Sequence, residues 1–368
     1  MRLFSVEVRD FRNLAHVCLT PAPRATVFVG NNGQGKTNLL EAIYFLCTLR
    51  PLRTARQAEL IRFGAPHADV SADARDEGGT RRVAVRLLPG TRTASLDGKP
   101  QARLDAYFEG LTAVAFCPDD LLLVKGGPDR RRRFLDRAAF NRWPAVLAEA
   151  REYMHALRCR NAALRAGPPG VEASFRGPLV RAGVRILCRR LDLLKELHPR
   201  VAKAYAEISG PDAPSVNLTY RSSFQADAAT GERELAAALT HSLEERSGRD
   251  RERGYTSIGP HADDLTLELD GHPARSFASQ GQQRALVLAL KVAEIENLCA
   301  ALGRPPFLLL DDVSSELDPQ KNRFLLDYLN RLPAQAFLTS TDPRLLEAAT
   351  GPDTALYSVA AGNVERLN

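Results

Sequence analysis

A glycine-rich octapeptide between a strand pattern and a helix pattern constrains this chain more than any other feature. The segment Gly30–Thr37 reads Gly-Asn-Asn-Gly-Gln-Gly-Lys-Thr and follows the apolar run Thr26–Val29. Its spacing of two glycines, a lysine and a threonine is a complete phosphate loop, and a strand before it and a helix after it are the context that this motif requires. A glycine-rich turn with a chance lysine is the alternative, and that context disfavours it. The pattern therefore predicts an α/β fold built around a nucleotide site.

The residue types in this loop have separate chemical roles. Glycines allow backbone N–H groups to turn inward on phosphates, and the helix N-terminus adds a partial positive charge. We expect Lys36 to neutralise charge on the β- and γ-phosphates and the Thr37 hydroxyl to ligate Mg²⁺. The predicted nucleotide contacts of the loop are Gly30, Asn31, Asn32, Gly33, Gln34, Gly35, Lys36, Thr37 and Asn38.

Two carboxylates follow a second apolar strand pattern. Phe307–Leu310 has the composition of a fully buried parallel strand, which would deliver Asp311 and Asp312 at its carboxyl end beside the phosphate loop. Asp311 suits a direct or water-mediated Mg²⁺ role, and Asp312 is placed to orient the attacking water. Alternatively, Asp-Asp after an apolar strand can simply begin a turn or helix. The next segment, Ser314–Asp318, favours the catalytic interpretation.

A third segment indicates which kind of phosphate-loop protein this is. Ser279–Gln283 reads Ser-Gln-Gly-Gln-Gln and opens a long helical pattern. It resembles the signature motif of ABC-type ATPases, and Ser315–Asp318 resembles their D-loop. In those proteins the signature reaches the γ-phosphate held by the other protomer, so the resemblance implies that Ser279, Gly281 and Gln282 contact ATP across a dimer. Such Gly/Gln/Ser turns are frequent, and the order of the motifs along the chain is what makes the resemblance specific.

Size and composition are those of an ordinary protein of this kind. The 368 residues can bury a large core and should form one big domain with an insert, or two domains. No stretch approaches about 18 uncharged apolar residues, so no membrane span is expected. The N-terminus has no signal-peptide pattern. The six cysteines are scattered without a C-x-x-C pair or a tight Cys/His cluster, so neither disulfides nor a zinc site is indicated. These features fit a cytoplasmic protein.

Positive charge is concentrated in the middle of the chain. The whole chain has a net charge of +6, while residues 125–200 contain 18 Lys/Arg and only 7 Asp/Glu. A basic insert on an acidic body is the electrostatic footprint of a polyanion-binding protein. Alternatively, these arginines coat a solvated helix face and pair with neighbouring carboxylates. The candidate DNA contacts are Arg130, Arg131, Arg132, Arg133, Arg185 and Arg189.

Periodicity divides the chain into a split body and an insert. Alternation over 69–96 predicts antiparallel strands, whereas 130–209 has helical periodicity with an apolar seam at Val180, Val184 and Leu187. That seam is either the core of a bundle or a surface for a partner helix. Arg246–Arg253 is polar and expected to be mobile. We predict an α/β, P-loop ABC-type ATPase head with a mixed sheet and an antiparallel lobe, formed by 1–120 and 255–368. A mainly helical, basic arm, 121–254, is inserted in it.

Several segments resemble one family over essentially the whole chain. Asp-Phe-Arg-Asn at Asp10–Asn13, Arg-Thr-Ala-Arg at Arg53–Arg56, Phe116–Leu121 and Ile-Gly-Pro-His at Ile258–His261 are similar to the RecF family of bacterial recombination-repair ATPases, which are related to SMC heads. The resemblance implies ATP as the nucleotide and makes Arg12 a further candidate contact to it.

The resemblance also implies a function. It suggests an ATP-dependent homodimer that closes on DNA, slow DNA-stimulated hydrolysis that releases it, and work with RecR and RecO in loading recombinase at gapped DNA. Two alternatives remain. An ABC transporter nucleotide-binding subunit should show a clear Q-loop and switch histidine, which are weak here. A binding module would hold ATP without meaningful turnover.

Some positions depart from the wider ABC pattern. Asp312 stands where many ABC ATPases carry glutamate, and its shorter reach suits slow hydrolysis. No histidine follows the strand pattern at Phe337–Thr341, so Thr341 is a weak substitute for the switch histidine, and Gln57 is a candidate for the Q-loop. His261 could sense nucleotide or DNA, although a histidine after Gly-Pro more often stabilises a turn.

Overall fold

The computed structural model describes residues 1–54, 56–76, 78–102, 104–224, 231–313, 317–342 and 353–368. The chain divides into two compact units, Met1–Asp120 with Leu298–Asn368, and Leu121–Asn297. The second boundary differs from the expected one, because residues 255–297 belong to the second unit rather than to the split body. Strand β10 (Asp264–Leu269) pairs along its length with β9 (Val216–Arg221), a strand that the sequence reading did not anticipate within the insert.

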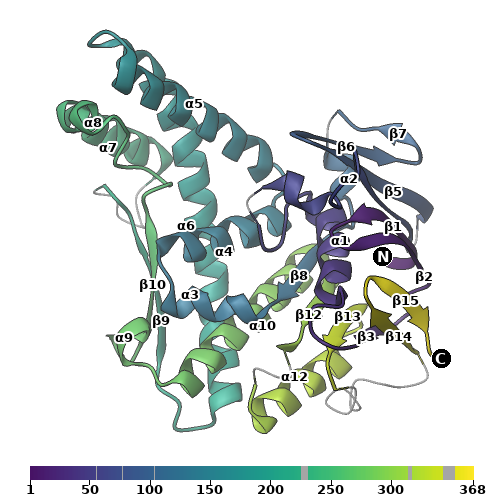
Figure 1. The fold of residues 1–368 in the computed structure, drawn as a ribbon. Coiled ribbons are helices and arrows are strands. Elements are labelled where there is room, and N and C mark those ends of the chain that lie inside the picture. The colour runs from purple at the N-terminus through teal and green to yellow at the C-terminus, as the bar shows by residue number, and fades with distance from the viewer. Residues whose placement is uncertain (55, 77, 103, 225–230, 314–316, 343–352) are drawn as a thin grey trace. The chain divides into compact units, whose positions relative to one another are not determined.

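A six-stranded, mainly parallel sheet organises the first unit (Figure 1). In sheet order its strands are β15 (Asn363–Arg366), β14 (Thr354–Ala360), β3 (Ala25–Val29), β13 (Ala336–Ser340), β12 (Phe307–Asp311) and β8 (Ala113–Phe116). The N-terminal β3 lies between the two C-terminal strands β14 and β13 and runs parallel to both. All five residues of β12, all five of β13 and all four of β8 are buried, and their sequences are apolar except at the polar C-terminal ends of β12 and β13. The expected parallel strand before Asp311 is confirmed.

An antiparallel sheet forms the second layer of this unit. In sheet order its strands are β2 (Leu14–Leu19), β1 (Arg2–Phe11), β4 (Ala68–Asp76), β5 (Gly79–Leu88), β6 (Thr91–Leu96) and β7 (Lys99–Pro100). Buried and exposed residues alternate along β4 and β5, as their sequences predicted. The helices of the unit are α1 (Lys36–Thr48), η1 (Gln57–Leu60), α2 (Asp105–Phe108), η2 (Pro118–Leu121) and α12 (Pro319–Arg331). Helix α1 contacts strands of both sheets, and eleven of its residues are buried.

Helices dominate the second unit, Leu121–Asn297. They are α3 (Leu122–Lys125), α4 (Pro128–Arg142), α5 (Val146–Ala166), η3 (Val171–Phe175), α6 (Arg176–Ser209), α7 (Glu232–Glu245), α8 (Ser247–Arg253), α9 (Ala274–Phe277) and α10 (Gln280–Leu302), whose last turns enter the first unit. A small sheet in the order β11 (His272–Pro273), β10, β9 completes the unit. No helix within the described residues is long and apolar enough to cross a membrane.

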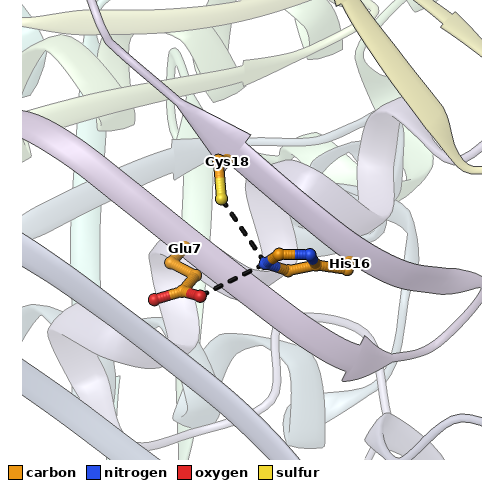
Figure 2. Close-up of side chains that lie close together, drawn as sticks. All are labelled: Glu7, His16 and Cys18. Atoms are coloured by element: carbon orange, nitrogen blue, oxygen red, sulfur yellow. Dashed lines mark hydrogen bonds and ion pairs between the residues drawn. The ribbon is translucent and has the colours of Figure 1, made fainter.

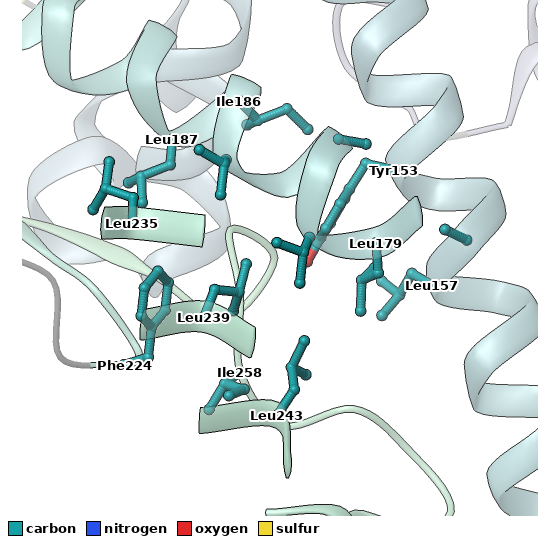
Figure 3. Close-up of a cluster of buried hydrophobic side chains, with 14 of the residues drawn as sticks. Tyr153, Leu157, Leu179, Ile186, Leu187, Phe224, Leu235, Leu239, Leu243 and Ile258 are labelled. Carbon is teal, nitrogen blue, oxygen red and sulfur yellow. The ribbon is translucent and has the colours of Figure 1, made fainter. Parts of the chain in front are cut away.

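The apolar seam of α6 forms the core of this unit. Val180, Val184 and Leu187 pack with Tyr153 of α5 and Leu239 of α7 in one buried cluster (Figure 3). The cluster is closed by residues of the same chain, so the seam is bundle core rather than a surface that waits for a partner helix.

The expectation of a mobile segment at Arg246–Arg253 is wrong. Residues Ser247–Arg253 form α8, and its Asp250 is fully buried. Arg160 of α5 donates from Nη1 to Asp250 Oδ2 at 2.9 Å and to Thr256 Oγ1 at 2.6 Å. A tertiary ion pair therefore orders a segment whose local composition favours solvent, because an unpaired charge at this depth would be costly.

Candidate nucleotide-binding site

The phosphate loop connects the end of β3 to the first turn of α1. Gly30, Gly33 and Gly35 all have positive φ values, of 156°, 79° and 116°. A Cβ at Gly30 would lie 2.2 Å from the Val359 carbonyl oxygen, and one at Gly35 would lie 2.8 Å from Asn13 Oδ1. Glycine is thus required at Gly30 by close packing against a backbone carbonyl, and at Gly35 chiefly by the positive φ, since the Asn13 side chain could move aside.

Lys36 folds back over the loop. Its Nζ donates to the carbonyl oxygens of Gly30 at 2.6 Å and Asn31 at 2.9 Å. Burial lowers the pKa of Lys36, while the nearby Asp312 and Asp311 act in the opposite direction. The ammonium group is therefore held inside the loop by backbone carbonyl oxygens. Phosphate oxygens could replace these carbonyls as its hydrogen-bond acceptors.

Three oxygen-bearing side chains meet at the carboxyl end of β12. Asp311 Oδ1 accepts hydrogen bonds from Thr37 Oγ1 at 2.7 Å and from Thr339 Oγ1 of β13 at 2.9 Å. Burial raises the pKa of Asp311, and the two hydroxyl donors moderate that rise. Hydroxyl and carboxylate oxygens are the ligands that Mg²⁺ prefers, so the residues present fit the predicted metal role of Thr37 and Asp311.

Asp312 is held in an unusual backbone conformation. Its φ is +48°, and its N–H donates to Thr339 Oγ1 at 2.9 Å. Positive φ at a non-glycine residue costs about 1–3 kcal/mol and is found where the surroundings enforce it. One buried hydroxyl, that of Thr339, therefore positions both adjacent aspartates. The sequence reading considered Thr341 on this strand and missed Thr339.

These groups surround one polar cavity of about 320 Å³. It is lined by Asn32, Gly33, Gly35, Lys36, Thr37, Asn38, Arg53, Pro118, Asp311 and Asp312. Eight of these ten residues were predicted site residues, and the structure brings them together from segments nearly 300 positions apart. Arg53 and Pro118 had no assigned role, although the segments containing them, Arg53–Arg56 and Phe116–Leu121, supported the family resemblance.

The middle of the loop is anchored from two sides. Asn13, in the turn between β1 and β2, donates from Nδ2 to the Gln34 carbonyl at 3.1 Å and accepts from Asn38 Nδ2 at 2.7 Å. In the turn between β14 and β15, Ala361 N donates to Gln34 Oε1 at 2.6 Å and Gly362 N donates to the Gln34 carbonyl at 2.8 Å. The Gln34 side chain is thus used to fix the loop and does not line the cavity.

Arg12 supports the site from behind. Its Nε donates to Glu41 Oε2 at 3.0 Å, and Glu41 is a fully buried residue of α1. Glu41 Oε1 also accepts from the backbone N–H of Arg53 at 3.2 Å, and Arg53 Nη2 reaches Asn38 Oδ1 at 2.6 Å. Arg12 is not a cavity-lining residue, whereas Arg53 is, so the guanidinium that faces the cavity comes from the Arg-Thr-Ala-Arg segment.

The signature segment forms the N-terminus of α10 in the second unit. Ser279 Oγ accepts from Gln282 N at 3.2 Å, and Gln282 Oε1 accepts from Ser279 N at 2.8 Å, which is a reciprocal capping box. Ser279 and Gly281 are exposed. In the D-loop prediction, Ser314–Glu316 lie outside the described residues, while Asp318 caps α12 by accepting from Lys321 N at 3.0 Å.

Comparisons with known proteins identify the family. The family described as RecF/RecN/SMC N terminal domain matches residues 2–363. The chain is 70% identical to the DNA replication and repair protein RecF of Anaeromyxobacter sp. (strain Fw109-5), with both chains covered completely, and 52% identical to RecF of Myxococcus xanthus over 99% of this chain and 97% of that one. The chain belongs to the RecF family.

Solved structures agree with this membership. The recombination mediator protein RecF-ATP of the RecFOR pathway is similar with a TM-score of 0.88 and 28% identity, covering 100% of this chain and 99% of that one. An Smc head bound to the C-winged helix domain of ScpA is similar with a TM-score of 0.56 at 16% identity, over 100% and 97% of the chains, which shows the fold alone. The predicted ABC-type ATPase head is confirmed, and RecF membership replaces the alternative of a transporter subunit.

Three further residues that the sequence singled out, Thr341, Gln57 and His261, do not line the cavity. Thr341 is exposed just beyond the end of β13, and Gln57 lies in η1; neither lines the cavity. His261 uses both ring nitrogens, since Nε2 lies 2.9 Å from the Thr256 carbonyl and Nδ1 lies 2.6 Å from Tyr153 Oη. A carbonyl can only accept, so Nε2 carries the proton and Nδ1 accepts from Tyr153. Burial lowers the pKa of His261, and this geometry favours a structural role.

The candidate DNA-contacting arginines of this RecF protein differ in their environments. Arg131 is buried and makes a bidentate pair with Asp264, at 2.7 Å and 2.9 Å, so its prediction as a DNA contact is not supported. Arg132 donates from Nη1 to the Asp263 carbonyl at 2.5 Å. Arg133 is exposed.

The two candidate arginines of α6 lie nearer to solvent, whereas Arg190 of the same helix is buried. Arg185 pairs with the exposed Glu152, and Arg189 lies 3.6 Å from Glu149 with its guanidinium 5.3 Å from the Trp143 ring centre. Helices α4 and α6 thus each carry both buried and solvent-facing arginines, which the sequence alone does not separate.

Proposed function

We propose that this chain is an ATP-dependent DNA-binding clamp that acts in recombinational DNA repair and replication-fork maintenance. The observation that carries the proposal is the convergence of Lys36, Thr37, Asp311 and Asp312 on one polar cavity behind a phosphate loop. Relatives that match over nearly their whole length and are named DNA replication and repair proteins support the same proposal.

ATP binding is the first step that these residues can perform. A phosphate loop of this kind uses its backbone N–H groups, here those of Gly33–Lys36, and the helix N-terminus to bind phosphates. Lys36 would exchange its two carbonyl acceptors, Gly30 and Asn31, for phosphate oxygens. The ammonium is charged in both arrangements, and exchange of a neutral carbonyl for an anionic phosphate oxygen adds the attraction between opposite charges, which makes the new hydrogen bonds shorter and stronger. Arg53 adds a second positive charge at the cavity wall.

Thr37 and Asp311 would hold the Mg²⁺ ion that accompanies the nucleotide. The chemistry that the ion would supply is to offset the negative charge that develops during transfer of the γ-phosphoryl group. For this, the Thr37 hydroxyl gives up its hydrogen bond to Asp311, and Asp311 must be ionised. Thr339 keeps the Asp311 carboxylate in place during the exchange.

Asp312 is the residue that we assign to the attacking water. Its backbone is fixed by Thr339, so its carboxylate can accept a hydrogen bond from a water in line with the γ-phosphate. The side chain of aspartate is one methylene shorter than that of glutamate, which suits slow, DNA-stimulated hydrolysis that ends the bound state of the clamp.

Dimerisation couples nucleotide to DNA in this proposal. The exposed N-terminus of α10, with Ser279, Gly281 and Gln282, carries a partial positive charge suited to a γ-phosphate held by a second copy, and the capping bonds of Ser279 and Gln282 would open to meet it. In this proposal α10 contributes to the ATPase head, as the sequence predicted for residues 255–368. In the structure, most of α10 belongs to the second unit.

DNA contact should be dominated by backbone phosphates. Arg130, Arg132, Arg133, Arg185 and Arg189 remain the candidate contacts, and such binding weakens steeply with salt because counterions are released. RecR and RecO are the proposed partners for loading recombinase at gapped DNA in the cytoplasm.

Sedimentation of the protein with and without a non-hydrolysable ATP analogue, and with and without duplex DNA, tests the proposal. We expect a dimer only with nucleotide, stabilised by DNA. Lys36→Ala should abolish ATP binding, and Asp312→Asn should trap an ATP-bound dimer on DNA. A chain that stays monomeric under all four conditions, or an Asp312→Asn variant with parental turnover, would contradict the proposal.

A further inference from the structure

Three side chains of different chemistry converge on the exposed face of the antiparallel sheet. Glu7 of β1 lies directly opposite Cys18 of β2, and His16 lies two residues from Cys18 on the same face. The intervening Val8 and Val17 point to the buried face, so strand alternation alone presents all three polar side chains to solvent. Figure 2 shows Glu7 and Cys18 both directed at the His16 ring.

The two distances from His16 Nε2 to the other polar atoms match those between ligands of one metal ion. His16 Nε2 lies 3.2 Å from Glu7 Oε1 and 3.4 Å from Cys18 Sγ. All three atoms lie within 4.8 Å of one another, and this is the one such group found in the part of the chain that the structure describes. In a tetrahedral zinc site, bonds of about 2.0–2.3 Å place neighbouring ligand atoms about 3.3–3.6 Å apart.

We propose that Glu7, His16 and Cys18 form a surface Zn²⁺ site whose fourth position is open to water. A thiolate, an imidazole and a carboxylate suit a borderline-soft ion such as Zn²⁺ and disfavour Mg²⁺, which prefers an all-oxygen set. The site is therefore chemically distinct from the Thr37 and Asp311 oxygens of the nucleotide cavity. The sequence offered only His-x-Cys, and the third ligand becomes visible through the register of β1 with β2.

Two arginines compete for the carboxylate ligand. Arg9 Nη2 lies 2.6 Å from Glu7 Oε1, and Arg82 Nη2 lies 3.2 Å from Glu7 Oε2. A metal ion at this site would therefore have to displace the Arg9 guanidinium from Glu7 Oε1. The Arg9 side chain is 57% exposed and can swing away, which leaves Oε1 for the metal.

Zinc at this position would join an edge strand to its neighbour. Strand β2 is the outermost strand of the sheet, and the turn that connects it to β1 carries Asn13, which holds the phosphate loop. A cross-link between the two strands stabilises the hairpin, because an ion that binds only the folded state adds its binding free energy to stability.

Titration of the full-length protein with Zn²⁺, after removal of metal by a chelator, tests the site. Calorimetry should show one equivalent of Zn²⁺ in the parental protein. Cys18→Ser and His16→Gln should lower the affinity by at least about 100-fold, the upper range for loss of even an outer-sphere partner. Co²⁺ should give a thiolate-to-metal charge-transfer band that Cys18→Ser abolishes.

A matched control exists on α5. Cys159 Sγ lies 3.8 Å from His155 Nε2, a Cys/His pair without a third ligand, so Cys159→Ser should leave Zn²⁺ affinity and the Co²⁺ band unchanged. Arg9→Gln should tighten binding, because it removes the competing guanidinium. All the changed side chains are exposed or partly exposed, and unfolding curves in chelator should match the parental curve.

The proposal fails if the parental protein binds no Zn²⁺, or if Cys18→Ser and His16→Gln bind it as the parent does. It also fails if Cys159→Ser removes the bound ion, since that would place the site on α5. Tighter binding by Arg9→Gln together with loss in both ligand variants would support it.

Discussion

Replacing Thr339 by valine should disable hydrolysis while leaving ATP binding largely intact. The Thr339 hydroxyl is 2% exposed, donates to Asp311 and accepts from the Asp312 N–H. Valine keeps the volume but leaves a buried N–H without its partner, which costs about 1–3 kcal/mol, and removes a bond to a carboxylate worth about 1.5–3 kcal/mol. Because the two terms share one group, we expect a loss of about 2–4 kcal/mol in the free energy of unfolding.

The effect on turnover should be larger than the effect on ATP affinity. Without the hydroxyl, the strained φ of Asp312 can relax, and a displacement near 1 Å of a positioning group can cost about 100-fold in rate. Lys36 and the loop N–H groups do not contact Thr339, so nucleotide binding should persist. Urea unfolding, steady-state ATPase rates and equilibrium binding of a fluorescent ATP analogue measure the three quantities separately.

Thr339→Ser is the matched control for this experiment. Serine retains the hydroxyl and loses only a methyl group, at a cost of about 1 kcal/mol, so turnover should stay near the parental value. If Thr339→Val unfolded within about 0.5 kcal/mol of the parent and hydrolysed ATP at the same rate, the assigned role of this hydroxyl would be refuted.

Three further outcomes are expected. On acidification, Mg²⁺-dependent ATP affinity should fall at a pH above the pKa of an ordinary aspartate, because burial raises the pKa of Asp311 and only its ionised form binds the metal. Calorimetric titrations across pH measure this affinity, and Asp311→Asn should abolish the dependence. Arg133→Glu should weaken DNA binding and reduce its salt dependence without lowering the melting temperature, because Arg133 is exposed. Arg131→Glu should instead destabilise the second unit by about 3–5 kcal/mol, because it leaves Asp264 facing a like charge. Asp250→Ala should also cost about 3–5 kcal/mol by stranding Arg160, seen as a lower urea midpoint.

The phosphate loop and the strand before Asp311 were predictable because their chemistry is local. Gly30–Thr37 is a contiguous pattern in a strand-loop-helix context, and the burial of β12 is written in its uninterrupted apolar residues. The sheet order supplied the rest, since nothing in the sequence states that β13 lies between β3 and β12. Thr339 and Asn13 act through that adjacency, so their roles could not be read from spacing.

The second unit was harder to read for a different reason. Arg131, Arg133 and Arg160 look alike in sequence, but their burial depends on whether a carboxylate lies opposite in the fold. Arg131 is buried because it pairs with Asp264, and Arg160 is buried because it pairs with Asp250; these partners lie about 90 to 130 positions away in the chain. The Arg160–Asp250 pair also explains why the segment that was expected to be mobile forms α8. The pairing of β10 with β9 places residues 255–297 in the second unit, which differs from the predicted boundary.

The position of β3 between β13 and β14 has a consequence for synthesis on the ribosome. A nascent chain can complete the contiguous Leu121–Asn297 unit early, whereas β3 waits for residues up to Ala360 before both of its neighbours exist. Until then this apolar strand has an edge of unpaired N–H and C=O groups, which favours aggregation or chaperone binding. Every prematurely terminated product that lacks β14 should therefore be unable to assemble the phosphate loop. We expect such products not to bind nucleotide, so that only chains translated past β14 do so.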